Sequence, residues 1–263
     1  MSYMGKYNKS ISYEKISQIY DISRASNSET VEKLIKLLHI DQNSIILDMG
    51  SGTGNYTAAL QQITQFIIGI DISIDMIKQA HMKYPMLNFI YGNIKNLPFN
   101  SETFDGIFAI QVLHHVKNKN SFLREAYRIL RKEAYIAIHS CSHTQMRAFW
   151  FYHYFPKGLN VDLTRIPDVG EITKLLENVG FSNVDFDICF QDEVVINETP
   201  ESYLKRKYRD SISTFSFLTE EDVILGCKKL QKDIISGVVE KIIQKSQEKV
   251  TKIGGSSIIY GKK

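Results

Sequence analysis

A glycine-rich segment is the part of this sequence whose residue types and spacing are best suited to chemistry. Asp48-Met49-Gly50-Ser51-Gly52-Thr53-Gly54 follows a short apolar run from Ser44 to Asp48 and precedes a helical segment from Asn55 to Gln62. Glycines let the backbone turn sharply and let a ligand approach without a Cβ in the way. A plain strand-to-helix turn does not require three alternating glycines, so the segment predicts a ligand site.

The glycine spacing and the preceding acid distinguish between two cofactors. The dinucleotide fingerprint is G-x-G-x-x-G, with the pyrophosphate at the helix N-terminus. This chain has G-x-G-x-G, and Asn55 stands where the third glycine of the fingerprint would be. The carboxylate of Asp48 would repel a diphosphate but attract the amino group of a methionine moiety. The loop therefore favours S-adenosylmethionine (SAM) over NAD, and the absence of a following Gly-Lys-Ser/Thr excludes a Walker loop.

A second acid ends the next apolar run. Ile67-Ile68-Gly69-Ile70-Asp71 places Asp71 about 20 residues after the first glycine of the loop, where an acid can accept hydrogen bonds from both ribose hydroxyls. Asp71 also precedes a helical segment, so it could instead cap that helix, and the two roles can coexist.

The elements that position these residues follow from hydrophobic periodicity. Strands are expected at 44–48, 66–70, 88–91, 104–110, 135–139, 184–190 and 256–260. Helices are expected at 29–39 behind a capping box at 26–29, at 55–62, at 74–83, over Phe122 to Leu130, from Ile172 to a stop at Gly180, and over most of 195–248. Residues 141–169 fit neither pattern. Apolar strands alternating with amphipathic helices indicate a doubly wound α/β fold with a mostly parallel sheet.

With these motifs the sequence resembles class I SAM-dependent methyltransferases of the small-molecule type, close to methyltransferase type 11. Tyr91 to Phe99 is similar to the family's G-D-A-x-x-L-P-F stretch, with Asn93 in place of the usual aspartate. Phe104 to Val116 resembles the fourth-strand motif and places Gln111 at its carboxyl edge. Tyr20-Asp21-Ile22-Ser23-Arg24 is similar to a Y-D-x-x-R element that folds over the cofactor in many relatives. The resemblance covers the core, about residues 40 to 140.

The resemblance implies a Rossmann-like sheet of seven strands, mostly parallel with the last strand antiparallel. It implies one domain over 1–263, with N-terminal lid helices at 1–40, a SAM-binding core at 41–140, and cap segments on the substrate side at 141–170 and 195–250. The expected cofactor is SAM and the product S-adenosylhomocysteine (SAH). The residues expected to contact the cofactor are Tyr20, Arg24, Asp48, Gly50, Ser51, Gly52, Asn55, Asp71, Ile72, Met76, Asn93, Ile94 and Gln111.

Three histidines are expected at the carboxyl edge of the sheet, where open α/β sheets bind ligands: His115, His139 and His143. Methyl transfer from a sulfonium is a displacement, so the enzyme must chiefly align the two reactants and exclude water. A general base is needed only if the nucleophile keeps its proton. A histidine at a strand end commonly just bonds a neighbouring loop, and we favour that role for each. His115 and His143 are the candidates for a base.

Aromatic residues concentrate in two segments of the chain that we expect to cover the cofactor. Tyr3, Tyr7, Tyr13 and Tyr20 lie near the N-terminus, and six rings lie between Phe149 and Phe155. Such rings can stabilise a cationic transition state or hold an apolar acceptor, although packing of the lid explains most of them. The residues expected to face substrate are Trp150, Tyr152, His153 and Arg165.

Composition sets the remaining expectations. A net charge of +3 with both signs interspersed does not suggest a nucleic-acid partner. Cys141, Cys189 and Cys227 are far apart, which suits a reducing cytoplasm rather than a disulfide framework. No apolar run approaches the length that spans a bilayer, and the N-terminus lacks a signal-like apolar region, so we expect no membrane partner.

Functions different from small-molecule methylation compete with this interpretation. Nucleic-acid and protein methyltransferases that modify the amino groups of adenine and glutamine resemble one another in an N/D-P-P-Y/F motif after the fourth strand. This chain has Gln111-Val112-Leu113-His114 at that place. A cytosine- or uracil-5 mechanism needs a cysteine near the fourth strand, where there is none. An arsenite methyltransferase would use several cysteines, and only Cys141 is suitably near. A NAD-dependent oxidoreductase and a non-catalytic SAM-binding protein are two further classes. Whether O, N or C is methylated, and the oligomeric state, are not indicated.

Overall fold

The fold is built on one mixed sheet, seen in a computed structural model that describes residues 17, 19–93, 96–190 and 198–263. Over these residues the sheet has seven strands in the order β3-β2-β1-β4-β5-β7-β6. The strands are β1 (Ile46–Met49), β2 (Ile67–Asp71), β3 (Asn88–Tyr91), β4 (Phe104–Ile110), β5 (Leu130–Ser140), β6 (Ser182–Cys189) and β7 (Ser256–Lys262). The pairs among β1 to β5 are parallel, and β7 is antiparallel to both of its neighbours. The predicted Rossmann-like sheet with an antiparallel last strand is confirmed.

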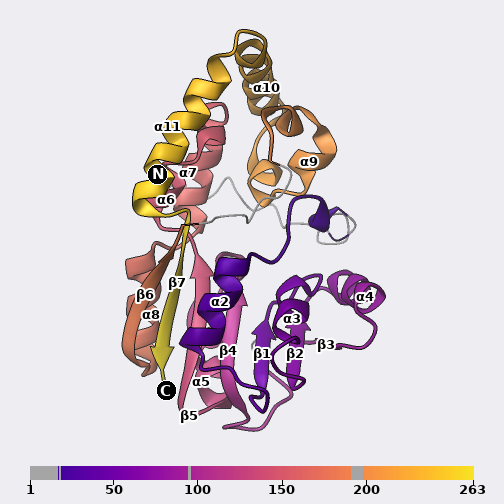
Figure 1. Cartoon of the computed structure of the whole chain (residues 1–263), viewed down its shortest axis with the longest axis vertical. Coiled ribbons are helices and arrows are strands. Elements are labelled where there is room, and N and C mark those ends of the chain that lie inside the picture. The colour runs from indigo at the N-terminus through magenta and orange to yellow at the C-terminus, as the bar shows by residue number, and fades with distance from the viewer. Residues whose placement is uncertain (1–16, 18, 94–95, 191–197) are drawn as a thin grey trace.

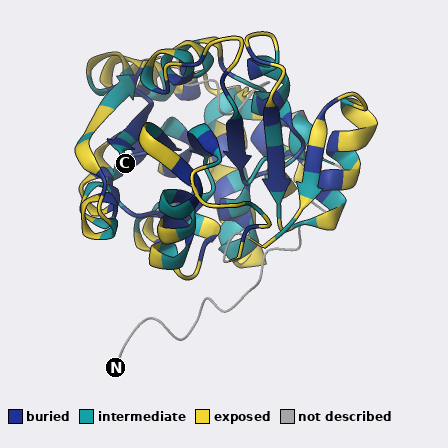
Figure 2. Ribbon diagram, turned by 90° about the horizontal axis from the view of Figure 1, so that it is seen from below, coloured by how far each residue is buried: buried dark blue, intermediate teal, exposed yellow. Residues whose placement is uncertain are grey.

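Both faces of the sheet are covered, which is why most residues of the central strands β1 and β4 are apolar. On one face, helices α5 (Lys119–Ile129) and α8 (Val169–Val179) pack their buried side chains against β1, β4 and β5. On the other face lie α2 (Ser28–Leu37) and α3 (Asn55–Leu60). Helix α4 (Ile74–Lys83) packs beside β2 and β3. Figure 2 shows the central strands buried and the outer helix faces exposed.

The N-terminal helix α2 packs on the sheet. Leu34 of α2 and its C-cap Leu38 are buried in one cluster with Ile46 of β1 and Phe108 of β4. A lid role for residues 1–40 stays a prediction. The N-cap of α2 is Asn27, whose side chain accepts a hydrogen bond from Thr30 N at 2.9 Å, rather than a capping box starting at Ser26. Tyr3, Tyr7 and Tyr13 lie outside the described residues.

Several strand boundaries differ from the expectation, and the differences at β5 and β6 are the most informative. Leu130, which the periodicity places in the helix, is fully buried and opens β5 opposite Phe104, because the backbone becomes extended immediately after Ile129. At the other edge of the sheet, β6 ends at Cys189, and Phe190 beyond it is 51% exposed. The expected alternation therefore runs one residue too far.

A helical cap stands above the carboxyl ends of the parallel strands, and its long hairpin α10–α11 is at the top of Figure 1. Two parts of the chain build it, one between β5 and β6 and one between β6 and β7. The first contains α6 (His143–Met146), η4 (Trp150–His153) and α7 (Pro156–Arg165); the second contains η5 (Pro200–Leu204), α9 (Arg206–Asp210), η6 (Ser213–Phe217), α10 (Glu220–Ile235) and α11 (Val238–Ile253). The cap has its own core, centred on buried aromatic residues such as Tyr154, Phe155 and Tyr203. Residues 141–169, which fitted no simple pattern, form short helices around these rings.

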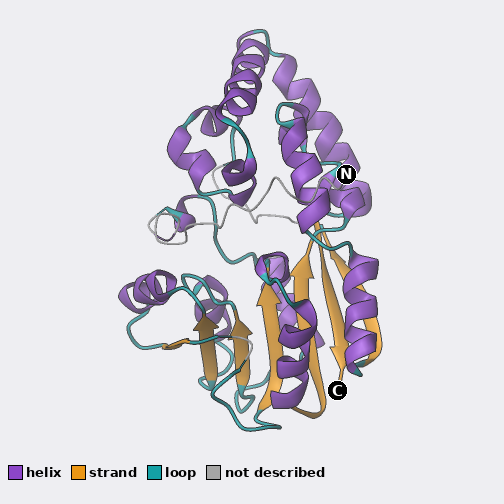
Figure 3. Cartoon of the chain, turned by 180° about the vertical axis from the view of Figure 1, so that it is seen from behind, coloured by secondary structure: helices purple, strands orange, loops and turns teal. Residues whose placement is uncertain are grey.

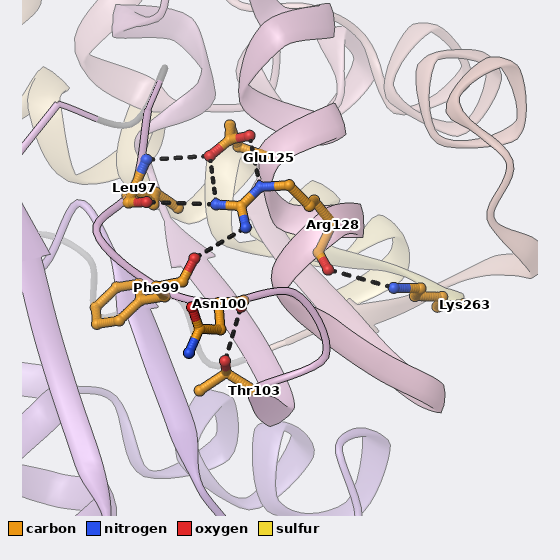
Figure 4. Close-up of polar contacts among 7 residues, drawn as sticks. All are labelled: Leu97, Phe99, Asn100, Thr103, Glu125, Arg128 and Lys263. Carbon is orange, nitrogen blue, oxygen red and sulfur yellow. Dashed lines mark hydrogen bonds and ion pairs between the residues drawn. The ribbon is translucent and has the colours of Figure 1, made fainter.

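The loop after β3 is fixed by an ion pair on α5 (Figure 4). Arg128 donates to the carbonyl oxygens of Phe99 at 2.9 Å and Leu97 at 3.3 Å. Glu125 accepts from Leu97 N at 3.0 Å and pairs with Arg128 at 2.9 Å. The stretch that resembled the family's L-P-F motif is thereby held against the sheet by groups that the sequence did not single out.

None of the described helices is long and apolar enough to cross a bilayer.

Candidate active site

The glycine loop connects β1 to α3 in a conformation that requires glycine. Gly50, Gly52 and Gly54 have φ angles of 87°, 53° and 84°, in the left-handed region that side chains disfavour. A Cβ on Gly50 would lie 2.7 Å from Val112 Cγ1. The loop thus passes close to the end of β4, where a larger residue would not fit.

Asp71 is held at the edge of the loop by backbone groups. Gly52 N donates to Asp71 Oδ2 at 2.9 Å, and Ser73 N donates to Oδ1 at 2.8 Å. Burial raises the pKa of this carboxyl, and the backbone hydrogen bonds oppose the shift. Each carboxylate oxygen keeps a lone pair for a ligand hydroxyl.

Asp48 lies deeper, at the end of β1. Its side chain accepts a hydrogen bond from Thr57 Oγ1 at 2.7 Å, and the residue is 2% exposed. Burial, with a smaller contribution from the charge of Asp71, raises the pKa of Asp48 to about 7. A cation bound beside Asp48 would favour the ionised carboxylate.

The short helix η2 (Tyr20–Ile22) ties the N-terminal segment to the loop. Asp21 accepts hydrogen bonds from Thr53 Oγ1 at 2.7 Å and Asn55 Nδ2 at 3.1 Å, and pairs with Lys83 Nζ at 2.8 Å. Ser23 extends this attachment to the cap, because Ser211 Oγ donates to Ser23 Oγ at 2.7 Å.

These groups enclose a narrow cavity of about 40 Å³ at the loop. Its lining residues are Tyr20, Arg24, Ala25, Asp48, Gly50, Ser51, Thr53, Asn55, Tyr56, Ile110 and Gln111. Seven of the residues expected to contact the cofactor are therefore brought together here: Tyr20, Arg24, Asp48, Gly50, Ser51, Asn55 and Gln111. Ser51 Oγ is buried and has no hydrogen-bond partner among the described residues. An unsatisfied buried hydroxyl beside Arg24 and Asp48 fits a site for a zwitterionic amino-acid moiety.

The other residues expected to contact the cofactor do not line the narrow cavity, and two of them lie next to Asp71. Gly52 donates to Asp71, and Ile72 is 53% exposed at the end of β2. Met76 is 2% exposed and is one of the buried apolar residues, and its contact with the cofactor stays a prediction. Asn93 is exposed after β3, and Ile94 lies outside the described residues.

Gln111 marks the boundary between the narrow cavity and the cap. It has a φ of 54°, a strained value for a residue other than glycine. Its Nε2 is 3.4 Å from His139 Nδ1, and His139 Nε2 is 2.9 Å from Ser256 Oγ. Burial lowers the pKa of His139 to about 4, so this ring is neutral and serves to hold Gln111.

A larger cavity of about 430 Å³ opens under the cap and shares Tyr20, Arg24 and Gln111 with the narrow one. Much of its wall is aromatic, from Phe149, Trp150, Phe151, Tyr152 and Tyr203. Trp150, Tyr152 and Arg165 were expected here. His153 was also expected here but is exposed outside the cavity, where its ring bonds Lys229 Nζ at 2.9 Å.

The two histidines considered as candidates for a base, His115 and His143, lie in different surroundings. His115 lines the larger cavity and is exposed to solvent. Nearby protein atoms, then the charges of Arg165 and Arg24, lower its pKa. His143 is not among the lining residues, and its Nε2 is 2.9 Å from the carbonyl oxygen of Ile166. His115 thus faces the larger cavity and His143 does not, and a role as base stays a prediction for His115.

Sequence reasoning missed Tyr203, which is central to the cavity wall. It is fully buried, stacks with Phe151 at a centroid distance of 5.4 Å, and meets Trp150 edge-on at 5.1 Å. Its hydroxyl donates to Glu198 Oε1 at 2.8 Å. The only local signal was the helix start at Thr199-Pro200, which says nothing about the direction of this ring.

The cysteines do not gather into a metal site. Cys141 lines the larger cavity, while Cys189 is fully buried in the sheet core and Cys227 bonds the carbonyl oxygen of Tyr203 from α10. The described part of the chain contains no group of three or more His, Cys, Asp or Glu side chains that could hold a metal ion.

The comparisons with known proteins return methyltransferases of several kinds. A family model described as a methyltransferase domain matches residues 47–138, and one described as protein-L-isoaspartate(D-aspartate) O-methyltransferase matches residues 1–89. A demethylmenaquinone methyltransferase of Bacillus licheniformis is 26% identical over 66% of this chain and 88% of its own length. An O-methyltransferase of Aspergillus nomiae is 30% identical over 54% of this chain and 65% of its own length.

A solved structure resembles the whole arrangement. It is a putative methyltransferase from an antibiotic biosynthesis pathway of Anabaena variabilis, with a TM-score of 0.77 and 27% sequence identity. The match covers 91% of this chain and 99% of the other, so it extends over both the sheet and the cap.

Proposed function

The chain belongs to the class I SAM-dependent methyltransferases, and we propose that it methylates a small molecule held in the cavity under the cap. The observation that carries this proposal is that the two cavities share Tyr20, Arg24 and Gln111. A cofactor at the glycine loop and an acceptor under the cap would therefore be immediate neighbours.

The residues around the loop suit the parts of SAM. Arg24 offers a positive charge for the methionine carboxylate, Asp48 a negative charge for the amino group, and Asp71 two oxygens for the ribose hydroxyls. Ile72 supplies an exposed apolar side chain next to Asp71, suited to the adenine ring. When bound, SAM supplies a methyl group activated by a positively charged sulfur.

The chain's own part in the transfer is alignment and exclusion of water. The aromatic wall and Tyr20 line the space beside Gln111, where they can align an acceptor with the methyl group. A base is needed only if the acceptor keeps its proton near neutral pH, and His115, which lines the same cavity, is then the candidate.

The size of the cavity favours a small acceptor over a macromolecule. About 430 Å³ lies within the range of small-molecule sites. The Bacillus and Aspergillus relatives are named for a quinone-type acceptor and for O-methylation, and we infer the same broad class here. An arsenite acceptor is not favoured, because Cys141 is the one cysteine lining the described cavity.

Two further expectations are part of the proposal. All three cysteines lie in the described part of the chain and form no disulfide, which fits a reducing cytoplasm. The hydrogen bond between Ser23 and Ser211, together with the shared cavity wall, fits a single domain in which core and cap work together.

The proposal is tested by methyl transfer from labelled SAM to a cell extract separated into metabolites and macromolecules. We expect label in a metabolite, with loss of signal in the heat-inactivated enzyme. Label found only in protein or nucleic acid would overturn the small-molecule assignment.

A further inference from the structure

Gln111 directly follows β4 and lines both the narrow cavity at the glycine loop and the larger cavity under the cap. Its φ angle of 54° lies in the left-handed region, which residues other than glycine rarely adopt. Such a conformation costs free energy and is found mainly at functional sites, where the surrounding structure holds a side chain in a required place. The strain at the junction of the two cavities directs attention to what the Gln111 side chain does there.

The nitrogen end of the Gln111 amide is bound at the end of β5. Nε2 lies 3.4 Å from His139 Nδ1, and it donates to Cys141 Sγ at 3.7 Å. Cys141 Sγ itself donates to the carbonyl oxygen of Gly255 at 3.5 Å, so its sulfur is left to accept from the amide. His139 is neutral and can accept at Nδ1 while Nε2 donates to Ser256 Oγ at 2.9 Å. Both neighbours therefore orient the nitrogen toward β5.

The carbonyl oxygen of the same amide is available to a ligand. Oε1 receives no hydrogen bond from the described residues, and it is not one of their buried polar atoms without a partner, so it is open to the space that Gln111 lines. Cys141, which the amide nitrogen contacts, lines the larger cavity and not the narrow one. The amide group is therefore on the side of the junction where the acceptor is expected.

The formal charges on the wall of the larger cavity cancel. Arg24 and Arg165 are balanced by Asp162 and Glu198, and the other lining residues carry no formal charge when histidine is neutral. Arg165 Nε donates to Asp162 Oδ1 at 2.6 Å, so this pair is compensated within the wall. A cavity with aromatic sides and no net charge suits a neutral molecule better than an ion, because an ion would lose its hydration without gaining a counter-charge.

We propose that Gln111 Oε1 selects the acceptor by accepting a hydrogen bond from its hydroxyl group, and that this acceptor is a neutral, ring-bearing hydroxyl compound such as a phenol. This inference rests on the proposed function and specifies its acceptor. The rings of the wall hold the apolar body, and Gln111 holds the hydroxyl at the junction beside the cofactor site. An amide oxygen is too weak a base to remove the hydrogen, so Gln111 orients the hydroxyl and does not deprotonate it.

The test compares two ligands that differ in one hydrogen-bond donor. The enzyme is saturated with SAH and titrated with 2-naphthol and with 2-methoxynaphthalene, which lacks the hydroxyl hydrogen, and calorimetry reports binding. Gln111→Met removes the amide and keeps the length of the side chain. We expect it to weaken 2-naphthol binding by about 3- to 10-fold, the worth of one hydrogen bond, and to leave 2-methoxynaphthalene within about twofold.

Gln247→Met is the matched control, because Gln247 lines the same cavity from α11 of the cap. It makes the same change of side chain and should leave the binding of both ligands within about twofold. Gln111→Asn is a second variant that should fold, since asparagine tolerates the left-handed backbone better than most residues. It withdraws the carbonyl oxygen by the length of one carbon–carbon bond and should cause the same selective loss of 2-naphthol.

Equal losses of the two ligands in a folded Gln111 variant, or no loss of either, would overturn the inference. A selective loss of 2-naphthol in Gln247→Met would also overturn it, because the hydroxyl would then pair with the cap. Failure of the unaltered complex with SAH to bind 2-naphthol would count against it as well. SAH affinity is measured separately for each variant, and failure of the unaltered protein to bind SAH would instead contradict the proposed function.

Discussion

Two aspartates at the ends of neighbouring strands have different environments and suit different parts of one cofactor. Asp71 is fixed by two backbone N–H groups, whereas Asp48 is almost fully buried and bonded by Thr57. Asp71 is therefore suited to accept hydrogen bonds from hydroxyl groups. The charge of Asp48 depends on the group that binds beside it.

Replacing Asp71 by alanine should weaken SAH binding by roughly 1–3 kcal/mol, the cost of a lost charged hydrogen-bond partner. Calorimetry measures this directly. Asp75→Ala is the matched control, because Asp75 lies on the adjacent α4 and pairs with Lys78 at 3.5 Å. Equal SAH affinities in the two variants would mean that Asp71 does not contact the ribose.

SAH affinity should rise with pH as Asp48 ionises. Its pKa is about 7 in the unliganded protein, so below this value binding beside a positively charged amino group must release a proton. We expect affinity to increase by up to about tenfold per pH unit below 7 and to level off above it. Calorimetric titrations at a series of pH values check this dependence.

Asp48→Asn keeps an oxygen for Thr57 but removes the charge. The variant should bind SAH more weakly above pH 7 and lose the pH dependence. A slope that persists in Asp48→Asn would assign the titration to another group.

Individual site residues were predictable from sequence where the local pattern fixes their position. The positions of Asp48, Gly50 and Asp71 could be predicted because the loop and the strand ends define them, and their contacts with the cofactor stay predictions. Tyr203 and Glu125 were not, because the direction of a side chain in a cap or on a helix depends on contacts with distant segments.

At the scale of elements, the glycine loop and the end of β4 are fitted to each other. Gly50→Ala should lower the free energy of unfolding by roughly 1–2 kcal/mol for the left-handed backbone. A further loss of roughly 1–3 kcal/mol is expected from the clash with Val112. Urea denaturation measures the sum.

Val112→Ala in the Gly50→Ala background should restore the part of the free energy of unfolding that is lost to the clash. A double-mutant cycle isolates it, since the backbone strain remains in both Gly50 variants. Strictly additive losses would show that the loop and β4 are not in close contact.

The helices and strands of the core were predicted from the sequence more accurately than those of the cap. Helix α4 was predicted with its observed bounds, because Ser73 caps it and its apolar spacing is regular. The error at Leu130 arose because a buried apolar residue suits either a helix or a strand, and pairing with Phe104 decides between them. In residues 141–169 the rings pack against segments more than forty positions away, such as Tyr203, so no local period exists.

At the scale of the whole molecule, three distant parts of the chain meet above the sheet. The N-terminal segment around Tyr20, the helices after β5 and the helices after β6 all contribute to the larger cavity. The fold class could be predicted from alternating apolar strands and helices. The convergence of Arg165 and Tyr203 on one cavity could not be predicted, because no local sequence pattern indicates that these two distant residues meet.

The most direct test of the account is a crystal structure of the enzyme with SAH bound. It should place the amino-acid part at the glycine loop near Arg24 and Asp48, the ribose at Asp71, and the sulfur beside Gln111, facing the cavity that contains Arg165. SAH bound away from the loop, or with its sulfur facing bulk solvent instead of the cap, would contradict the central claim that the two cavities form one site for methyl transfer.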